Sequence, residues 1–394
     1  MITVEDALSR VLALAESADG EVLSLEQAAG RALLAPATAQ LTQPPFDAAA
    51  MDGYALRAQD IGQSLRVIGE SAAGHPWTGQ PAPGTAIRIF TGAPVPAGYD
   101  QVVMQEMTRR DGEMLTVTEP PRGSHIRPRG GDFALGDSLA PGRLLTAADI
   151  GLLAAMNIPE VTVARRPSVA ILAGGDELVR PGQTPKEGQI ISSNDLAIAA
   201  LATEAGALPT ILPIARDSLE SLRDRFRQAA TADLIVTIGG ASVGDHDLIA
   251  RVAEELGMER AFYKLAMRPG KPLMAGRIGR SAMLGLPGNP VSAITCGILF
   301  MQPLIRRMQG LPVGNRLHRA RLAIDIPAEG DRQHYLRARL EPGGDLPAIA
   351  PFEDQDSAKL SLMSQADALL FRPAHDAPRG AGEIVDYLPL RGGN

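Results

Sequence analysis

Four glycine-rich turns carry most of the residues whose types could do chemistry. They are Gly174-Gly175-Asp176-Glu177, residues 239–247 (GGASVGDHD), Arg268-Pro269-Gly270-Lys271-Pro272 and residues 286–292 (LPGNPVS). Glycine lets backbone N–H groups approach an oxyanion closely, and a helix that begins at such a turn adds favourable partial charge. A tight connection between a strand and a helix needs the same glycines, so one turn alone does not indicate a ligand.

The charged residues of these turns indicate an anion and a metal ion. Arg268 and Lys271 supply full positive charge for a phosphate or a tetrahedral oxyanion. Glu177, Asp245 and Asp247 offer the hard oxygen ligands that Mg²⁺ prefers. Carboxylates near helix starts also serve as caps. It is the combination within one stretch of chain that predicts an anion-plus-metal site.

Three further loops precede these turns, at residues 43–55, 90–96 and 127–132. The first contains two aspartates, the second is rigid and neutral, and the third is basic and rich in glycine. Ordinary β-turns account for them equally well, so these loops by themselves name no reaction.

The elements that position these residues follow from hydrophobic periodicity. Residues 3–16 and 24–34 read as helices, with Thr3 as a cap, and a helical pattern returns at 146–156. Short alternating runs from 42 to about 139 predict an inserted β-rich module. From 166 to 312 strands and helices alternate, which predicts a doubly wound, mostly parallel sheet, with Asn194 as the cap of one helix. Strands return after 312 and predict a small β domain.

Composition narrows the class of protein. The chain has 394 residues and a net charge of −7, which argues against a general nucleic-acid or membrane-surface binder. Its one cysteine, Cys296, cannot form an intrachain disulfide and is expected to be a buried core residue. Neither a signal peptide nor a membrane span is predicted, so we expect a cytoplasmic protein.

Eight segments together resemble the MoeA family of molybdopterin molybdenumtransferases, which is related to the E domain of gephyrin. In the family's order they are PPFDAAAMDGYA (44–55), IFTGAPVPAGYDQVVMQE (89–106), IRPRGGDFALGD (126–137), GGDEL (174–178), SNDL (193–196), GGASVGDHD (239–247), KLAMRPGKP (264–272) and LPGNPVSA (286–293). The resemblance extends over essentially the whole chain.

The resemblance implies a four-part fold. Residues 1–41 with 136–165 would form an N-terminal linking and dimer domain, and 42–135 the inserted β-rich domain. Residues 166–312 would form a MoaB/Mog-like α/β domain that binds molybdopterin, and 313–394 a barrel-like C-terminal β domain. Members are elongated homodimers whose active sites lie between the α/β domain of one subunit and the inserted domain of the other.

The resemblance also implies the reaction. Adenylylated molybdopterin and molybdate would be the substrates, Mg²⁺ the cofactor, and AMP a product. Asp52, Thr91, Asp132, Glu177 and Lys271 match catalytic positions, and Asp245, Asp247 and Glu177 match the Mg²⁺ ligands. The implied substrate-binding residues are Gly239, Gly240, Ser242, Lys264, Arg268, Lys271, Pro287, Gly288, Asn289, Pro290 and Ser292. Arg268, Lys271, Arg337 and Ser361 would reach the molybdate, with Ser364 as an alternative to Ser361.

Two other functions of the same fold stay open at this point: the molybdopterin adenylyltransferase that makes the substrate, and a non-catalytic scaffold. The GGAS turn at 239–242 favours the molybdenum-inserting enzyme, because the adenylyltransferases tend to carry a GGTG-like turn there. An upstream adenylyltransferase and apo-molybdoenzymes would be partners. Tungstate and molybdate have the same charge and nearly the same size, so the sequence does not separate them.

Overall fold

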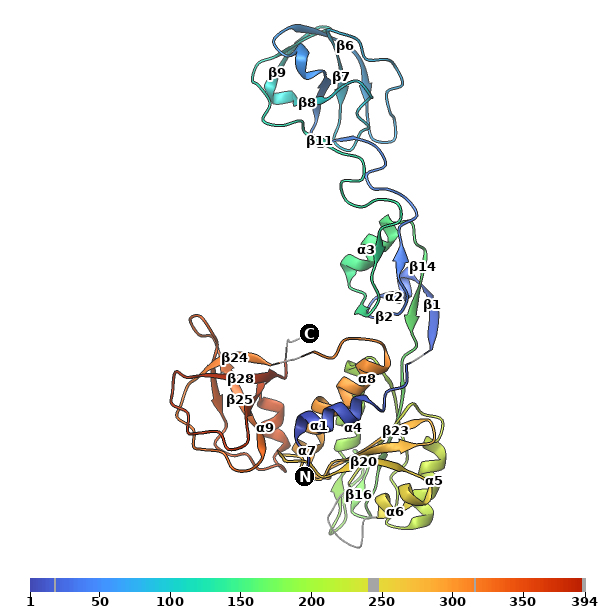
Figure 1. The fold of residues 1–394 in the computed structure, drawn as a ribbon, viewed down its shortest axis with the longest axis vertical. Helices are drawn as coiled ribbons and strands as arrows, with labels where there is room; N and C mark the ends of the chain where they lie inside the picture. Colours follow the sequence, from blue (N-terminus) through green and yellow to red (C-terminus); the bar gives the residue numbers. More distant parts are fainter. Residues whose placement is uncertain (18, 240–247, 315–316, 392–394) are drawn as a thin grey trace. The chain divides into compact units, whose positions relative to one another are not determined.

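The computed structural model describes residues 1–394 apart from 18, 240–247, 315–316 and 392–394. It divides into two compact units (Figure 1). Unit 1 comprises Met1–Glu21 and Ala164–Asn394, and unit 2 comprises Val22–Val163. Four of the predicted site residues, Gly240, Ser242, Asp245 and Asp247, lie outside the described residues.

A six-stranded sheet forms the centre of unit 1, and it confirms the predicted α/β class. Its neighbouring strands β18, β15, β19 and β23 are parallel, and β22 and β20 continue the sheet as antiparallel strands. Every residue of β19 and β23 is buried, as expected of parallel strands covered on both faces. The bounds in sheet order are β18 (Leu208–Ile211), β15 (Ser168–Ala173), β19 (Leu234–Ile238), β23 (Ser281–Leu286), β22 (Met274–Ile278) and β20 (Glu259–Tyr263).

Helices cover both faces of this sheet because successive strand residues point to opposite sides. Ala170 and Leu172 pack against α5 (Leu219–Ala229) and α6 (Leu248–Glu255). Val169 and Ile171 belong to the other core, which takes in α1 (Val4–Leu12), α4 (Asn194–Glu204), α7 (Pro290–Cys296) and α8 (Gln302–Met308). A π-helical segment, Gly297–Met301, joins α7 to α8, and Cys296 is fully buried there. Figure 1 shows α5 and α6 together on one side of the sheet.

The first helix packs in the α/β core of unit 1. Thr3 caps α1 by accepting a hydrogen bond from the Asp6 N–H at 3.1 Å, as its sequence position predicts. Val4, Ala7 and Val11 are its buried face, and they share a core with the central sheet. The spacing of these apolar residues therefore attaches the first 21 residues to unit 1.

A closed five-stranded barrel forms the C-terminal part of unit 1, which confirms the predicted β domain. The strands pair in the order β25, β26, β24, β28, β27, and β27 returns to β25. Their bounds are β24 (His318–Leu322), β25 (Gln333–Glu341), β26 (Ala348–Pro351), β27 (Ala368–Arg372) and β28 (Ile384–Pro389), with α9 (Leu360–Gln365) between β26 and β27. The short strand β21 (Met267–Arg268) adds to β25 in parallel. The pair β16 (Leu178–Val179) and β17 (Ile190–Ile191) completes the strands of unit 1 in the described ranges.

Unit 2 contains the predicted β-rich module. Its six strands follow the order β8 (Gln101–Met104), β5 (Gly53–Leu56), β7 (Thr85–Ile89), β6 (Ser64–Ser71), β10 (Met114–Val117) and β9 (Thr108–Asp111). Two short 3₁₀ helices, Ala58–Asp60 and Gln105–Met107, connect them. Two-stranded pairs extend the module: β4 (Ala48–Ala49) with β11 (Ile126–Arg127), and β3 (Ala37–Thr38) with β12 (Ser138–Leu139).

The helix predicted over 24–34 is wrong. Only one turn forms, α2 (Leu25–Ala28), and Gly30 then adopts a positive φ of 73°, which ends the helix. The next residues form β2 (Ala32–Leu33), in a sheet ordered β1 (Gly20–Ser24), β14 (Glu160–Ala164), β2 and β13 (Arg143–Leu144). The helix predicted at 146–156 is confirmed as α3 (Ala147–Ala155), and Thr146 and Asp149 form its capping box.

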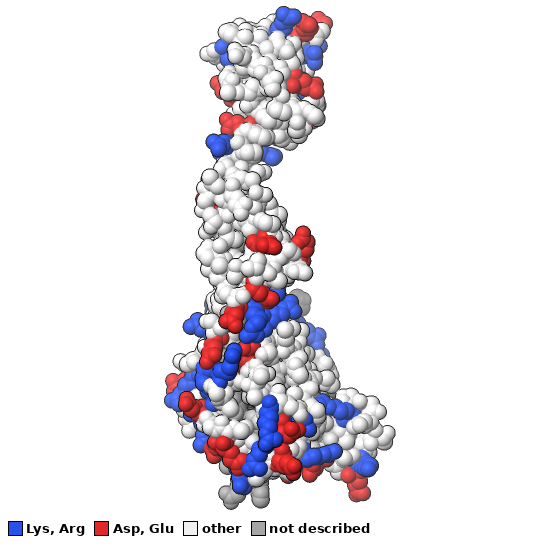
Figure 2. All heavy atoms as spheres, turned by 90° about the vertical axis from the view of Figure 1, so that its right-hand side faces the viewer, with Lys and Arg blue, Asp and Glu red and all other residues white. Residues whose placement is uncertain are grey.

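The surface carries charges of both signs. Figure 2 shows Lys and Arg interspersed with Asp and Glu over unit 1, whereas much of unit 2 is uncharged on that face. A positive site for an anion must therefore be local, because the net charge is −7. In the part of the chain that the structure describes, no helix has the length and apolar character needed to cross a membrane.

Asp233, the residue before β19, is hydrogen-bonded to the segment at the start of β15. Its carboxylate accepts two hydrogen bonds from Arg165, both 2.9 Å, and two from Ser168, at 2.6 and 2.7 Å. Burial opposes ionisation, but these contacts outweigh it and lower the pKa of Asp233 to about 2. Asp233 therefore contributes stability above its unfolded pKa, and this is lost as pH falls from about 4 to about 2.

Replacing Asp233 by asparagine is expected to lower the free energy of unfolding at pH 7 by roughly 2 kcal/mol. The difference from wild type should shrink as pH falls below about 4, because the wild-type carboxyl then protonates. Urea unfolding at pH 7 and at pH 3 measures both. The exposed Asp386 serves as control, as Asp386→Asn should leave both values unchanged. A difference that stays constant over this pH range would contradict the assignment.

Candidate functional site: a cationic cavity and the turns at the strand ends

The first residues of three predicted turns, Gly174, Gly239 and Pro287, lie at one edge of the central sheet. Ala173, Ile238 and Leu286, the last residues of β15, β19 and β23, are register partners. The residues that directly follow them, Gly174, Gly239 and Pro287, therefore begin side by side. The Gly239 N–H donates to the Leu286 carbonyl at 3.2 Å, and a Cβ on Gly288 would lie only 3.6 Å from the Gly239 Cα. Gly239 and Gly288 thus pack closely at the edge of the sheet where ligands of such folds bind.

The loop at 287–290 is held from two sides. Asn289 precedes α7 and Pro290 is its first residue, a position that suits proline. The Asn289 amide donates to Ser357 Oγ at 3.0 Å, and the Asn194 amide donates to the Gly288 carbonyl at 2.6 Å. The prediction that Asn194 caps a helix is wrong: Ser193 precedes α4, and Asn194 is the first helical residue. Its side chain is used to hold this loop instead.

The fourth turn, 268–272, opens onto a cavity of about 340 Å³ in unit 1. The wall comes from three places in the sequence: the turn itself, the start of α7, and the barrel with the 355–357 segment. Residues that line it are Arg268, Pro269, Gly270, Lys271, Pro272, Val291, Ser292, Arg332, His334, Tyr335, Arg337, Gln355, Asp356 and Ser357. The structure therefore brings the predicted Arg268, Lys271, Ser292 and Arg337 together.

The cavity is strongly cationic. Four of its lining residues are Arg or Lys, and Asp356 is the one carboxylate among them. Within the described residues, the side chains of Arg268 and Lys271 make no hydrogen bond or ion pair. Their charges are therefore available to an anionic ligand.

Arg337 is a buried cation, with only 1% of its surface exposed. Its guanidinium donates to Gln355 Oε1 at 3.3 Å and to the carbonyl oxygens of Lys359 and Asp354 at 3.1 and 3.2 Å. Burial lowers the pKa of Arg337, which Asp354 and Asp356 oppose, but an arginine stays protonated in proteins. Because these hydrogen bonds go to neutral oxygens, they fix the side chain without cancelling its charge.

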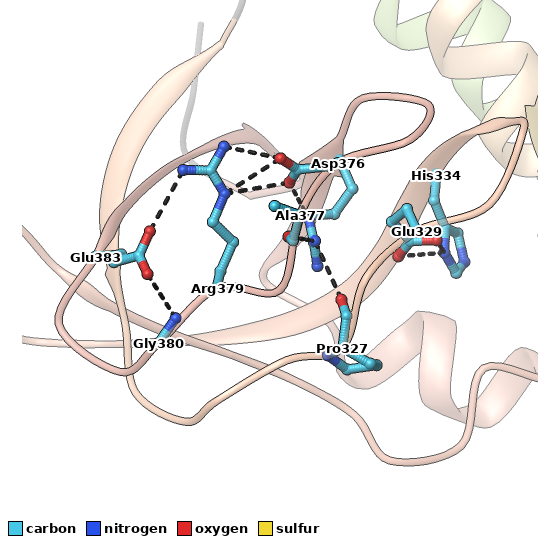
Figure 3. A network of polar contacts seen from close by, with 9 residues as sticks. Pro327, Glu329, His334, Asp376, Ala377, Arg379, Gly380 and Glu383 are labelled. Atoms are coloured by element: carbon cyan, nitrogen blue, oxygen red, sulfur yellow. Dashed lines mark hydrogen bonds and ion pairs between the residues drawn. The ribbon is translucent and has the colours of Figure 1, made fainter.

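Sequence reasoning missed Arg332, His334, Gln355 and Ser357. The pairing of β21 with β25 puts Arg268 opposite His334 and thereby places Arg332 and His334 at the cavity. No local spacing indicates this pairing, because it joins residues 66 positions apart. His334 Nδ1 contacts the Glu329 carboxylate at 3.0 and 3.1 Å (Figure 3).

Lys264 and Ser361 are predicted binding residues that belong neither to the cavity wall nor to the turns at the strand ends. Lys264 has a positive φ of 70°, and its ammonium lies over the Tyr263 ring, 5.1 Å from the centroid. Ser361 is exposed on α9, as is Ser364, and the serines that line the cavity are Ser292 and Ser357. The sequence leaves Ser361 and Ser364 as alternatives for the serine at the molybdate. The structure puts Ser357, and neither of these two, in the cavity wall.

Glu177 is the one predicted Mg²⁺ ligand within the described residues. Its carboxylate folds back over Gly175, where an added Cβ would come within 2.3 Å of Oε2. Over residues 1–394 without the undescribed positions, no three His, Cys, Asp or Glu side chains are grouped so as to hold a metal ion. Glu177 is a suitable oxygen donor, but one carboxylate does not make a site.

The three loops of the inserted module come together in unit 2. Ala49 N donates to the Ala93 carbonyl at 2.9 Å, and Ala50 N donates to the His125 carbonyl at 2.9 Å. Asp132 N donates to the Gln43 carbonyl at 3.1 Å, which ties the third loop to the first. Residues far apart in sequence thus share one surface of unit 2.

Asp52 and Thr91 form a direct pair on this surface. The Thr91 N–H and hydroxyl donate to Asp52 Oδ1 at 2.8 and 2.9 Å. These hydrogen bonds, the backbone one first, lower the pKa of Asp52, and Arg88 adds a smaller effect. Arg88 itself lies over the rings of Tyr54 and Phe90, at 5.2 and 4.8 Å from their centroids. Asp52 is thus kept as an exposed carboxylate with a fixed direction.

Replacing Thr91 by valine is expected to raise the pKa of Asp52 toward its ordinary value, because one of the two hydrogen bonds is lost. If turnover requires the Asp52 carboxylate, the acid side of the pH–activity profile moves to higher pH, with little change at neutral pH. The profile of Thr91→Val against wild type measures this. Thr116→Val, on β10, is the control and should leave the profile in place. If the acid side of the pH–activity profile does not move in Thr91→Val, the Asp52 carboxylate is not required for turnover.

Comparison with known proteins agrees with this architecture. Protein-family models match three consecutive regions: the MoeA N-terminal region (domain I and II) over residues 2–157, a probable molybdopterin binding domain over 170–307, and the MoeA C-terminal region (domain IV) over 319–390.

Two curated relatives and two solved structures extend the comparison. A molybdopterin molybdenumtransferase of Nostoc sp. is 38% identical over 391 residues, which cover 94% of this chain and 89% of that protein. One of Haemophilus influenzae is 38% identical over 317 residues, covering 79% and 78%. Two crystal structures of a molybdopterin biosynthesis MoeA protein from Pyrococcus horikoshii superpose with TM-scores of 0.83 and 0.86, at 30% and 26% identity, and cover 98% or more of each chain. The chain therefore belongs to the MoeA family, the family of molybdopterin molybdenumtransferases.

Proposed function

We propose that this chain inserts molybdenum from molybdate into adenylylated molybdopterin, with cleavage of the phosphoanhydride and release of AMP. The observation that carries the proposal is the cationic cavity of unit 1. Molybdate is a small tetrahedral dianion, and a cavity of about 340 Å³ with four Lys or Arg residues in its wall suits such a ligand.

The cations of the cavity have different parts in this proposal. Lys271 and Arg268 are unpaired among the described residues and would contact the oxyanion directly. Arg337, held by Gln355 and two carbonyls, would present a fixed charge from the barrel side. Ser292 and Ser357 add hydroxyl groups to the same wall. Together they would hold the dianion beside the turn at 268–272.

The pterin would bind along the strand ends next to this cavity. Gly239 and Gly288 pack closely at this edge, and Ser357 connects the 287–290 loop to the cavity wall. A terminal phosphate on the loop before α7 would gain from the backbone N–H groups there. In this proposed arrangement the dithiolene of the substrate would lie near the oxyanion that supplies the metal.

The finer features of the reaction rest on the family resemblance. We propose that Mg²⁺ is held by Asp245, Asp247 and Glu177, where it would neutralise the charge of the phosphoanhydride. We further propose a cytoplasmic homodimer in which Asp52, Thr91 and Asp132 of one subunit complete the site of the other.

The test is AMP release from purified adenylylated molybdopterin without ATP, with and without molybdate and with and without Mg²⁺. Release that depends on molybdate, with a product that activates a cofactor-free molybdoenzyme, would support the proposal. Consumption of ATP together with molybdopterin would identify an adenylyltransferase instead. If no oxyanion supports AMP release, the chain is a non-catalytic scaffold of the same fold. Sedimentation at the mass of one 41.5 kDa chain would exclude a site shared between two subunits.

A further inference from the structure

His334 and Glu329 form a buried pair at the edge of the cationic cavity. His334 is 5% exposed and lines the cavity, and its Nδ1 contacts both carboxylate oxygens of Glu329 (Figure 3). A neutral imidazole carries one proton, so the contact with a carboxylate places that proton on Nδ1. Nε2 is then left with a free lone pair.

Nε2 is the nitrogen of His334 that Glu329 does not contact, and His334 belongs to the cavity wall. Nε2 has no hydrogen bond to any described residue, yet it is not among the fully buried polar atoms that lack a partner, which are Arg225 Nε, Thr237 Oγ1 and Thr295 Oγ1. It is therefore accessible, and the cavity is the space that His334 lines. An imidazole nitrogen in this position can accept a proton and then donate it to a ligand in the cavity.

In the absence of a ligand, the charged groups around His334 and its burial determine its protonation state. Burial, the largest cause, lowers the pKa of His334, Arg268 and Arg332 lower it further, and Glu329 opposes them. Lys271, Tyr335, Arg337 and Asp356 are the other charged or titratable groups of the cavity wall. On the neighbouring strand β27, Arg372 is the register partner of His334, and its charge is paired with Asp376. The net effect leaves the imidazole neutral at pH 7.

We propose that His334 takes up a proton when molybdate enters the cavity and donates it through Nε2 to an oxygen of the oxyanion. The inference rests on the proposed function, because it requires molybdate in this cavity. A bound dianion offsets the repulsion from Arg268 and Arg332 and favours the imidazolium. Binding of the dianion is therefore coupled to the uptake of one proton by His334.

The proton balance is simple. Solvent supplies one proton to Nε2, and the imidazolium keeps Nδ1–H on Glu329. Transfer from Nε2 converts MoO₄²⁻ to HMoO₄⁻ and restores the neutral imidazole. No electron moves. Oxygen can leave molybdenum as water only after protonation, so this step begins to prepare the oxyanion for the sulfur ligands of the pterin.

Calorimetric titration of the full-length protein with sodium molybdate at pH 7, in buffers of different ionisation enthalpy, counts the protons taken up on binding. We expect a measurable uptake in wild type and an affinity that falls as pH rises, by at most about tenfold per pH unit. His334→Asn keeps a donor for Glu329 but cannot titrate, so its uptake should vanish. His318→Asn is the matched control, because His318 lies in the same barrel and contacts Tyr387 instead; its uptake should equal that of wild type.

The outcomes separate the two proposals. If wild type binds no molybdate, the proposed oxyanion site is wrong, and the role of His334 is wrong with it. If wild type binds molybdate without proton uptake, or His334→Asn takes up as many protons as wild type, only the role of His334 is overturned. If His334→Asn does not fold, Glu329→Gln decides. It keeps the imidazole but removes the charge that favours the imidazolium, so uptake should shift to lower pH; an unchanged pH dependence would overturn the proposal.

Discussion

Replacing Lys271 by alanine is expected to reduce molybdate-dependent AMP release by about 10- to 100-fold while leaving the protein folded. The ammonium makes no hydrogen bond or ion pair with a described residue, so its removal leaves no buried partner unsatisfied. The loss should instead appear in oxyanion binding, where a hydrogen bond from a charged group is worth about 1.5–3 kcal/mol.

Two measurements together test this prediction. The dissociation constant for molybdate should rise by the same factor as activity falls, and the thermal midpoint should stay within the error of wild type. Lys186→Ala is the control, since Lys186 is another exposed lysine of unit 1, outside the cavity. Lys271→Arg should recover part of the affinity, because the charge is kept but the donor geometry changes. Full activity in Lys271→Ala would remove this residue from the site.

Replacing Asp376 by alanine is expected to lower the free energy of unfolding of the C-terminal barrel by roughly 3–5 kcal/mol. Arg372 is 1% exposed, and its Nε donates to Asp376 Oδ2 at 2.5 Å. Arg379 donates to the other carboxylate oxygen at 2.8 Å and also reaches Glu383 at 3.3 Å (Figure 3). Without Asp376 the Arg372 charge stays buried, and its remaining hydrogen bonds go to the carbonyls of Pro327 and Ala377.

The pH dependence of the same site has a definite sign. The hydrogen bonds from Arg379 and Arg372 lower the pKa of Asp376 although burial opposes them. Its contribution is therefore present above the unfolded pKa of an aspartate and is lost as pH falls below it. The destabilisation by Asp376→Ala should accordingly be largest at neutral pH and diminish in acid.

An exposed pair gives the matched control for Asp376. Asp345 contacts Arg321 at 2.7 Å in the same barrel, but both side chains are well exposed. Asp345→Ala should cost no more than about 1 kcal/mol, as is usual for surface ion pairs. Chemical unfolding followed by barrel fluorescence or circular dichroism gives both values. Equal effects for the two substitutions would show that burial of Arg372 is not the cause. Because the barrel carries Arg337 and His334, molybdate binding by Asp376→Ala should fail at a lower temperature than in wild type.

Family membership, fold class and the main strands could be read from the sequence because they depend on local signals. The apolar runs at 168–173 and 282–286 indicate buried strands wherever they pair, and the turn after each strand of a parallel sheet must fall at the same edge. Arg268 and Lys271 stood out because they are charged residues in a rigid glycine turn. Each of these features lies within a few neighbouring residues.

The other features of the fold and of the site were decided by the tertiary structure, because these features depend on contacts between distant segments. The helix expected at 24–34 gives way to β2, since Gly30 breaks it and pairing with β13 and β14 stabilises the strand. Asn194 holds the 287–290 loop rather than a helix end. The pairing of β21 with β25 adds Arg332 and His334 to the cavity. Ser357, another residue of the wall, accepts a hydrogen bond from Asn289. Composition and periodicity do not encode which distant segments meet, and the cavity is built from those meetings.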